Sequence, residues 1–132
     1  AGYVINREAY QEYFRKMHVL FPKCKKMVMA LRNQLASSHH TLTGLLYDAV
    51  HDCLYTTKIY DIQPIVDPMG VGDAFVAGYI HAHQKWAADN QYCLDFALSA
   101  SALKNTIPGD QNLVTEEEII SNLTSSGGRI QR

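Results

Sequence analysis

The segment Asp67-Pro68-Met69-Gly70-Val71-Gly72-Asp73-Ala74-Phe75-Val76-Ala77-Gly78-Tyr79 decides the fold of this chain. Ile65 and Val66, which precede it, are typical of the end of a buried strand. Gly70 and Gly72 then allow a sharp turn, because glycine adopts positive φ without steric cost. After Gly72 the apolar residues recur at helical spacing. The segment therefore predicts a strand that turns into a helix.

The start of this predicted helix is suited to bind an anion. Its first N–H groups have no partner within the helix, and together with the helix dipole they attract negative charge. Asp73 falls in the first turn, beside that position. A carboxylate next to a bound phosphate can take the proton from an attacking hydroxyl. The alternative is that Asp73 only stabilises a tight turn as a favourable first-turn charge.

Composition narrows the class of protein. The length of 132 residues fits one domain, and the formal net charge of -1 provides no basic field for nucleic acid. The three cysteines are widely spaced and odd in number, which indicates reduced thiols in a cytoplasmic protein. No apolar run approaches the roughly 20 residues that span a bilayer. We therefore expect a cytoplasmic protein with neither a nucleic acid nor a membrane as partner.

Apolar periodicity predicts the order of the elements. Helices are expected over residues 7–20, 72–86 and 91–104, with a last helix capped by Thr115; strands over 25–31, 42–50 and 54–59, the last two as a hairpin; and loops over 32–41 and 105–112. The strand at 25–31 is nearly all apolar, as expected of an internal strand buried on both faces. Gly78 predicts close packing of its helix on a strand. This order predicts the α/β class, with helices packed on a sheet.

The full string Asp67-x-x-Gly70-x-Gly72-Asp73-x-Phe75-x-x-Gly78 resembles the C-terminal signature of the ribokinase-like (PfkB) family of sugar kinases. The usual form in that family is Asp-Thr-x-Gly-Ala-Gly-Asp-x-Phe. The resemblance implies that Gly70, Val71 and Gly72 form the anion hole for the transferring phosphoryl group. It also implies that Asp73 is the catalytic base and touches the substrate hydroxyl. The chain departs from the usual form at Pro68, normally threonine, and at Val71, normally alanine.

The resemblance extends over residues 25–123 and implies a fold, substrates and a cofactor. The implied fold is part of a ribokinase-like three-layer α/β/α sandwich with a mixed sheet. The implied reactants are ATP with Mg²⁺ and a sugar or sugar acid, and residues 31–33 and 106–110 look most like the 2-keto-3-deoxygluconate kinase branch. Asn105 would contact ATP, and Arg32 would bind a phosphate or a substrate carboxylate. The alternatives are an ordinary surface role for Arg32 and helix-end capping by Asn105.

The resemblance also sets expectations for domain organisation. The family's N-terminal half has no counterpart in this chain, so residues 1–124 are expected to be the C-terminal part of a sugar kinase domain, inactive alone, and 125–132 a flexible tail. Missing partner strands would leave a sheet edge open, where a homodimer could form. No protein metal site is expected, because His39 and His40 lack a third ligand at a suitable spacing. Two other functions stay open, a non-catalytic domain that binds a nucleotide or sugar phosphate and a folded chain without a ligand.

Overall fold

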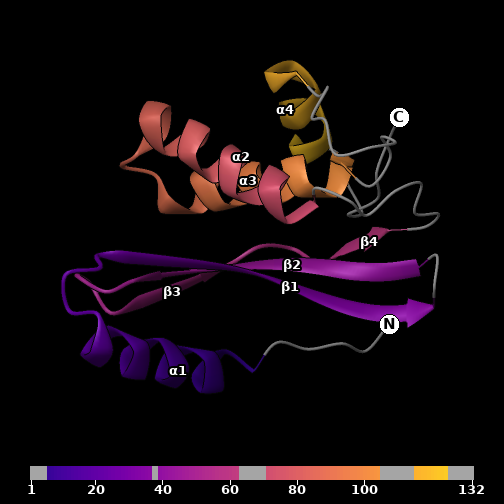
Figure 1. The fold of residues 1–132 in the computed structure, drawn as a ribbon. Helices are drawn as coiled ribbons and strands as arrows, with labels where there is room; N and C mark the ends of the chain where they lie inside the picture. Colours follow the sequence, from indigo (N-terminus) through magenta and orange to yellow (C-terminus); the bar gives the residue numbers. More distant parts are fainter. Residues whose placement is uncertain (1–5, 37–38, 63–70, 105–114, 125–132) are drawn as a thin grey trace.

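The computed structural model describes residues 6–36, 39–62, 71–104 and 115–124 of the chain. These residues form three layers, with α1 on one face of a sheet and α2, α3 and α4 on the other face (Figure 1). The α/β class is confirmed, and the layering matches part of the three-layer sandwich that the resemblance implies.

The helix α1, Arg7–Leu20, has the bounds that the sequence predicts. Asn6 caps its start, because the side-chain oxygen of Asn6 accepts a hydrogen bond from the Ala9 N–H at 3.1 Å. Phe14 is the buried residue of the helix, and its ring stacks on that of Tyr47 with centroids 5.6 Å apart. Arg15 forms two hydrogen bonds to Asp52, 3.0 and 2.8 Å long. These contacts fix α1 to the strands and turn of the following hairpin.

The strands form one sheet in which β2 is central. Its strands are β1 (Lys26–Ala36), β2 (His39–Asp48), β3 (Cys53–Thr56) and β4 (Tyr60–Ile62). β1 pairs with one side of β2, while β3 and β4 share the other side. All pairings between the described strands are antiparallel, so the mixed sheet that the resemblance implies is not seen in this part of the chain.

Successive side chains of a strand point to opposite faces of the sheet, so the strands lie between two apolar layers. The layer on the α1 side contains Phe14, Leu45, Tyr47 and Leu54, with Met27, Met29 and Leu31 packed against them. The layer on the other side contains Leu42, Leu46, Tyr60, Ile62, Phe75, Leu94, Ala97, Leu98 and Ala102, with Val28, Tyr55 and Tyr79 packed against them. Met27, Val28, Met29 and Leu31 are thus only partly buried, and β1 lies at the edge of the described sheet, not inside it with both faces buried as the sequence predicts.

Two helices, α2 (Val71–Trp86) and α3 (Asn90–Lys104), form a hairpin over the second layer. They approach closely at Gly78. A Cβ atom added there would lie 3.1 Å from the Ala100 Cβ and 3.2 Å from the Ala97 Cα. The sequence predicts this close approach, but the partner is a helix and not the strand that we expected. The small residues of α3 are what allow the two helix axes to come so near.

The last described helix, α4 (Glu116–Thr124), begins with the capping box that the sequence predicts. The Thr115 hydroxyl accepts from the Glu118 N–H at 3.2 Å, and Glu118 Oε1 accepts from the Thr115 N–H at 3.2 Å. Ile119 buries against α3, and its carbonyl accepts a hydrogen bond from the Ser99 hydroxyl at 2.8 Å. The cap and these contacts together place α4 on the outer side of α3.

The predicted loop between β1 and β2 is wrong. Residues 32–41 were expected to be a loop, but β1 continues to Ala36 and β2 begins at His39. The polar residues of this stretch pair across the hairpin, with Asn33 opposite Thr41 and Gln34 opposite His40. Strand pairing thus overrides the polar composition, because the backbone hydrogen bonds do not depend on side-chain polarity. The expected strand at Ile65 and Val66, the loop at 105–112 and the tail at 125–132 lie outside the described residues.

We predict that Gly78→Leu destabilises the chain. The new side chain gains less than about 1 kcal/mol of helix propensity, whereas overpacking against the α3 backbone costs about 1–3 kcal/mol. Urea unfolding followed by circular dichroism measures the difference. The matched control is Ala77→Leu, which adds a leucine at the neighbouring exposed position of α2 and should change the unfolding free energy by no more than about 0.5 kcal/mol. Equal effects of the two variants would contradict the prediction.

Candidate functional site

The first turn of α2 carries the residues that the sequence singles out. Val71 and Gly72 open the helix, and Asp73 is the acidic residue of its first turn. Asp73 is exposed to solvent and not enclosed in apolar packing. No heavy atom of the described residues lies within 4 Å of the position that a Gly72 Cβ would occupy. Among the described residues, nothing covers this position, and Asp73 stands beside the first N–H groups of the helix, which have no partner within the helix.

The rotation of α2 about its own axis, which its buried residues fix, determines where Asp73 points. Ala74 and Phe75, which follow it, are 3% and 4% exposed, and Phe75 packs into the layer above the sheet. Gly78, four residues after Ala74, fixes the same side of the helix against α3. Asp73 therefore lies on the outward stripe of α2, which at i+4 includes Ala77. The burial of its neighbours prevents the helix from rotating Asp73 into the core.

Arg32 lies on the same side of the sheet as α2. It is opposite Leu42 in the pairing of β1 with β2, and opposed residues of an antiparallel pair share one face. Leu42 packs with Phe75 in the layer beneath α2, so the Arg32 side chain leaves the sheet towards that layer. Arg32 is exposed and lies within β1, not at the end of the strand as the sequence suggested.

The end of α3 places a buried cation near the start of α2. Because the helices form an antiparallel hairpin in contact at Gly78, the last turn of α3 lies beside the first turn of α2 (Figure 1). Lys104, the last residue of α3, is 0% exposed. Two residues of the expected site, Gly70 and Asn105, lie outside the described residues, as does the Val71 side chain.

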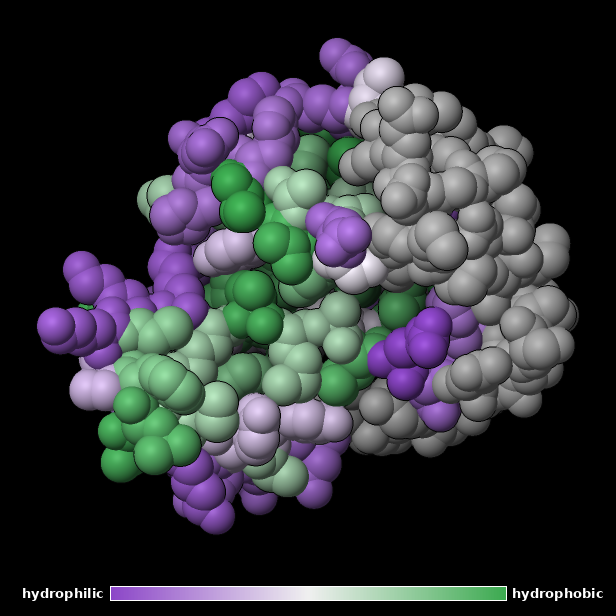
Figure 2. Space-filling model, in the orientation of Figure 1, coloured by the Kyte–Doolittle hydropathy of each residue, from purple (hydrophilic) through white to green (hydrophobic). Residues whose placement is uncertain are grey.

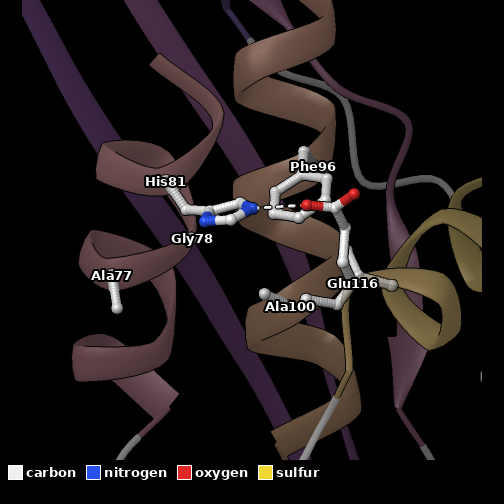
Figure 3. Close-up of a pocket in the computed structure, with 7 residues that line it drawn as sticks. Ala77, Gly78, His81, Phe96, Ala100 and Glu116 are labelled. Carbon is white, nitrogen blue, oxygen red and sulfur yellow. Dashed lines mark hydrogen bonds and ion pairs between the residues drawn. The ribbon is translucent and has the colours of Figure 1, made fainter. Parts of the chain in front are cut away.

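A cavity of about 290 Å³ opens along the outward stripe of α2 (Figure 3). Its walls come from three helices, and the lining residues are Ala77, Gly78, His81, Phe96, Ala100, Glu116 and Ile119. It starts at Ala77, one helical turn after Asp73. Small residues on α2 and α3 create the space, and an aromatic ring and a charged pair border it.

Glu116 connects α4 to α2 at the rim of this cavity. Its Oε2 atom lies 2.6 Å from His81 Nε2 and accepts a hydrogen bond from Lys85 Nζ at 2.7 Å. The hydrogen bonds from Lys85 and His81 hold the pKa of Glu116 below its ordinary value. The His81 ring also stacks on that of Phe96, with centroids 5.6 Å apart and an angle of 24° between the planes. The hydrogen bond to Glu116 orients the His81 ring towards α4.

Sequence reasoning missed the pairing of His81 with Glu116. The two residues are 35 positions apart, and the acidic first turn of α4 has a sufficient local explanation in helix capping. Only the three-dimensional packing of α4 against α2 brings them together.

The described residues contain no group of three His, Cys, Asp or Glu side chains that could hold a metal ion. Cys24, Cys53 and Cys93 are free thiols. Among the helices of the described residues, none has the length and apolar character needed to cross a bilayer.

No protein-family model matches the chain, and no curated protein matches it. Solved structures do match. The structure of 2-dehydro-3-deoxygluconokinase from Thermotoga maritima has 28% sequence identity and a TM-score of 0.83 over 91% of this chain. A PfkB family carbohydrate kinase from Listeria grayi has 28% identity and a TM-score of 0.80 over 95% of it. A third structure, from Enterococcus faecalis, has 21% identity and a TM-score of 0.76, which supports the fold alone.

The matches show that the chain is structurally similar to part of the PfkB carbohydrate kinases. The chain spans 35% of the Thermotoga maritima kinase and 36% of the Listeria grayi kinase. The similarity agrees with the resemblance that the Gly70–Asp73 segment carries in the sequence. It covers about a third of a kinase of this kind.

We predict that the Glu116 pair stabilises the chain in a pH-dependent way. A carboxyl whose pKa is lowered on folding contributes stability above its unfolded pKa, and this is lost as the pH falls through the folded pKa. The Glu116→Gln variant should therefore have a lower melting temperature than the wild type at pH 7. Below about pH 4 its melting temperature should approach the wild-type value. The control is Glu117→Gln, which removes an exposed charge at the next position. A deficit for Glu116→Gln that is equal at pH 7 and at pH 3 would contradict this assignment.

Proposed function

We propose that this chain forms the phosphoryl-transfer part of an ATP-dependent kinase that phosphorylates a hydroxyl of a sugar or sugar acid. The observation that carries the proposal is the exposed Asp73 carboxylate in the first turn of α2. The structural match to two carbohydrate kinases supports it, as does the string of residues from Asp67 to Gly78.

Two groups of the chain would act on the reactants. The N–H groups of Gly70, Val71 and Gly72 would donate hydrogen bonds to the γ-phosphate of ATP as its negative charge shifts in the transition state. Asp73 would accept the proton of the attacking hydroxyl.

Arg32 is the candidate for recognising the acceptor. Its guanidinium is always charged and can bind a carboxylate through two hydrogen bonds. It leaves β1 on the face that α2 covers, the side of the sheet on which Asp73 lies. A carboxylate-bearing acceptor such as 2-keto-3-deoxygluconate suits this cation. An uncharged sugar would leave the Arg32 charge without a role in binding.

Mg²⁺ fits this site as a companion of the nucleotide. Mg²⁺ in kinases takes most of its ligands from substrate phosphates and waters, so a cluster of three protein ligands is not required. When bound, it neutralises the charge of the nucleotide phosphates. Asn105, which follows the buried Lys104, is our candidate for contact with ATP.

We predict that Asp73→Asn removes phosphoryl transfer without removing nucleotide binding. The test uses a chimera in which this chain replaces the matched third of the Thermotoga maritima kinase. Asn cannot accept the proton, so turnover should fall by about 100-fold or more, while the Kd for ATP measured by calorimetry should change less than about 3-fold. Glu117→Gln is the charge-matched control and should keep the turnover of the chimera.

Two results would contradict the proposal. Near-normal turnover of the Asp73→Asn chimera would exclude Asp73 as the base. A chimera that binds ATP as tightly as the parent kinase, yet transfers no phosphoryl group, would favour a non-catalytic domain that binds a nucleotide or sugar phosphate. On the isolated chain, a nuclear magnetic resonance titration with ADP and Mg²⁺ should shift the Gly72 and Asp73 amide signals before others.

A further inference from the structure

A second cavity lies between α3, the end of α4 and the segment that joins β3 to β4. Its volume is about 220 Å³, and the described residues that line it are Lys58, Tyr60, Gln91, Asp95 and Leu123. None of these residues lines the cavity beside Glu116 or belongs to the first turn of α2. The second cavity is therefore separate from the candidate functional site.

The polar lining of this cavity distinguishes it from the surface above β1. Figure 2, in the orientation of Figure 1, shows a hydrophobic area over α2 and the β1 edge of the sheet, bordered by hydrophilic residues. The cavity lies at the other edge, because β3 and β4 pair with the side of β2 that β1 does not use. It has a carboxylate and an ammonium group in its walls, so it suits a polar ligand.

The Asp95 carboxylate is the anionic group of the cavity. It is half-buried, and burial raises the pKa of its carboxyl above the ordinary value. Among the described residues, Gln91 donates the one hydrogen bond that this carboxylate receives, from Nε2 to Oδ1 at 3.0 Å. The same Nε2 atom donates to the Thr56 carbonyl at 2.9 Å, which fixes the Gln91 amide. Asp95 Oδ2 and Gln91 Oε1 thus remain as acceptors that receive no donor from these residues.

Lys58 is the cationic group of the cavity. Its Nζ atom lies 5.1 Å from the centre of the Tyr60 ring, within the range of a cation–π contact. The charge of Lys58 lowers the pKa of Asp95, but by less than burial raises it. The attraction of Lys58 therefore does not offset the burial of the carboxylate, and a further positive group beside Asp95 would be stabilising.

The remaining walls of the cavity are uncharged. Tyr60 is 1% exposed, and burial raises the pKa of its phenol to about 12, so the ring carries no charge at neutral pH. Leu123, in the last turn of α4, is half-buried and contributes an aliphatic wall. The cavity thus combines one anion, one cation and an apolar surface.

We propose that this cavity binds a small zwitterion, namely an α-amino acid with an apolar side chain. The ammonium group of the ligand donates hydrogen bonds to Asp95 and to the Gln91 side-chain oxygen, and its carboxylate pairs with Lys58. Its side chain lies against Tyr60 and Leu123. Charge complementarity selects this class, because a simple anion would meet the Asp95 carboxylate and a simple cation would meet Lys58.

The size and place of the cavity agree with this ligand. A volume of about 220 Å³ is below the usual range for drug-sized ligands, so the ligand is small. Asp95 is nine positions before Lys104, which is about 14 Å along the axis of α3 from the end that lies beside the first turn of α2. The inference therefore does not depend on the proposed kinase activity.

A nuclear magnetic resonance titration of the chain with L-alanine, L-valine and L-leucine tests the proposal. The amide signals of Gln91 and Asp95 should shift and saturate. Two matched compounds are isobutylamine, which is L-valine without its carboxylate, and 3-methylbutanoate, which is L-valine without its ammonium group. Each should bind at least about 10-fold more weakly than L-valine, because each loses a charge-assisted contact. Absence of saturable shifts with all three amino acids would overturn the proposal, as would equal binding of L-valine and either matched compound.

Two variants remove the charges of the cavity in turn. Asp95→Asn and Lys58→Met should each weaken the binding of L-valine by about 10-fold or more. The matched controls Glu117→Gln and Lys16→Met remove exposed charges of the same two signs outside the cavity. They should change the Kd of L-valine by less than about 2-fold, because solvent and salt screen such charges. Unchanged binding of L-valine in either cavity variant would overturn the proposal.

The pKa of the Asp95 carboxyl gives a readout that needs no variant. A bound ammonium group favours the ionised carboxylate, so this pKa, measured by carbon-13 resonance of the carboxyl, should fall when the wild-type chain is saturated with L-valine. 3-Methylbutanoate should not lower it, because that compound has no positive group. An Asp95 pKa that is unchanged or higher in the presence of saturating L-valine would overturn the proposal, since the ammonium would then lie elsewhere.

Discussion

The contact of α2 with α3 at Gly78 is the constraint on which the candidate site depends. Because a Cβ there would meet the Ala97 backbone at 3.2 Å, the two helices approach more closely than larger residues would permit. That approach fixes the phase of α2, with Phe75 buried in the layer above the sheet and Asp73 outward. It also sets the last turn of α3 beside the first turn of α2. A single glycine thus controls how the carboxylate and the first N–H groups are presented.

The sequence was sufficient where a local rule determines the structure. α1 and α2 appear within one residue of their predicted bounds, because their apolar residues recur at helical spacing. The Thr115 capping box was equally readable, since both of its hydrogen bonds join residues three positions apart. The Asp73 position followed from the same logic, because glycines before a helical pattern indicate where the helix begins.

The sequence was insufficient where partners are distant along the chain. The extension of β1 through Asn33 and Gln34 depends on pairing with β2, and polar side chains give no sign of it. The bond between His81 and Glu116 requires α4 to pack beside α2, which no spacing within either helix reveals. The face on which Arg32 lies could be assigned only from its register with Leu42. Each of these features is tertiary, and each contributes to the neighbourhood of the candidate site.

The candidate site and the open sheet edge are linked by the geometry of one helix. The outward stripe of α2 begins at Asp73 and continues through Val76 and Ile80, so the polar start and the apolar middle of the helix face the same way. Arg32, on the edge strand, leaves the sheet on that side. A polypeptide that covered Val76 and Ile80 would therefore also bound the space in front of Asp73 and reduce its access to water. In the kinase function that we propose, exclusion of water from that space would strengthen the electrostatic interactions on which phosphoryl transfer depends.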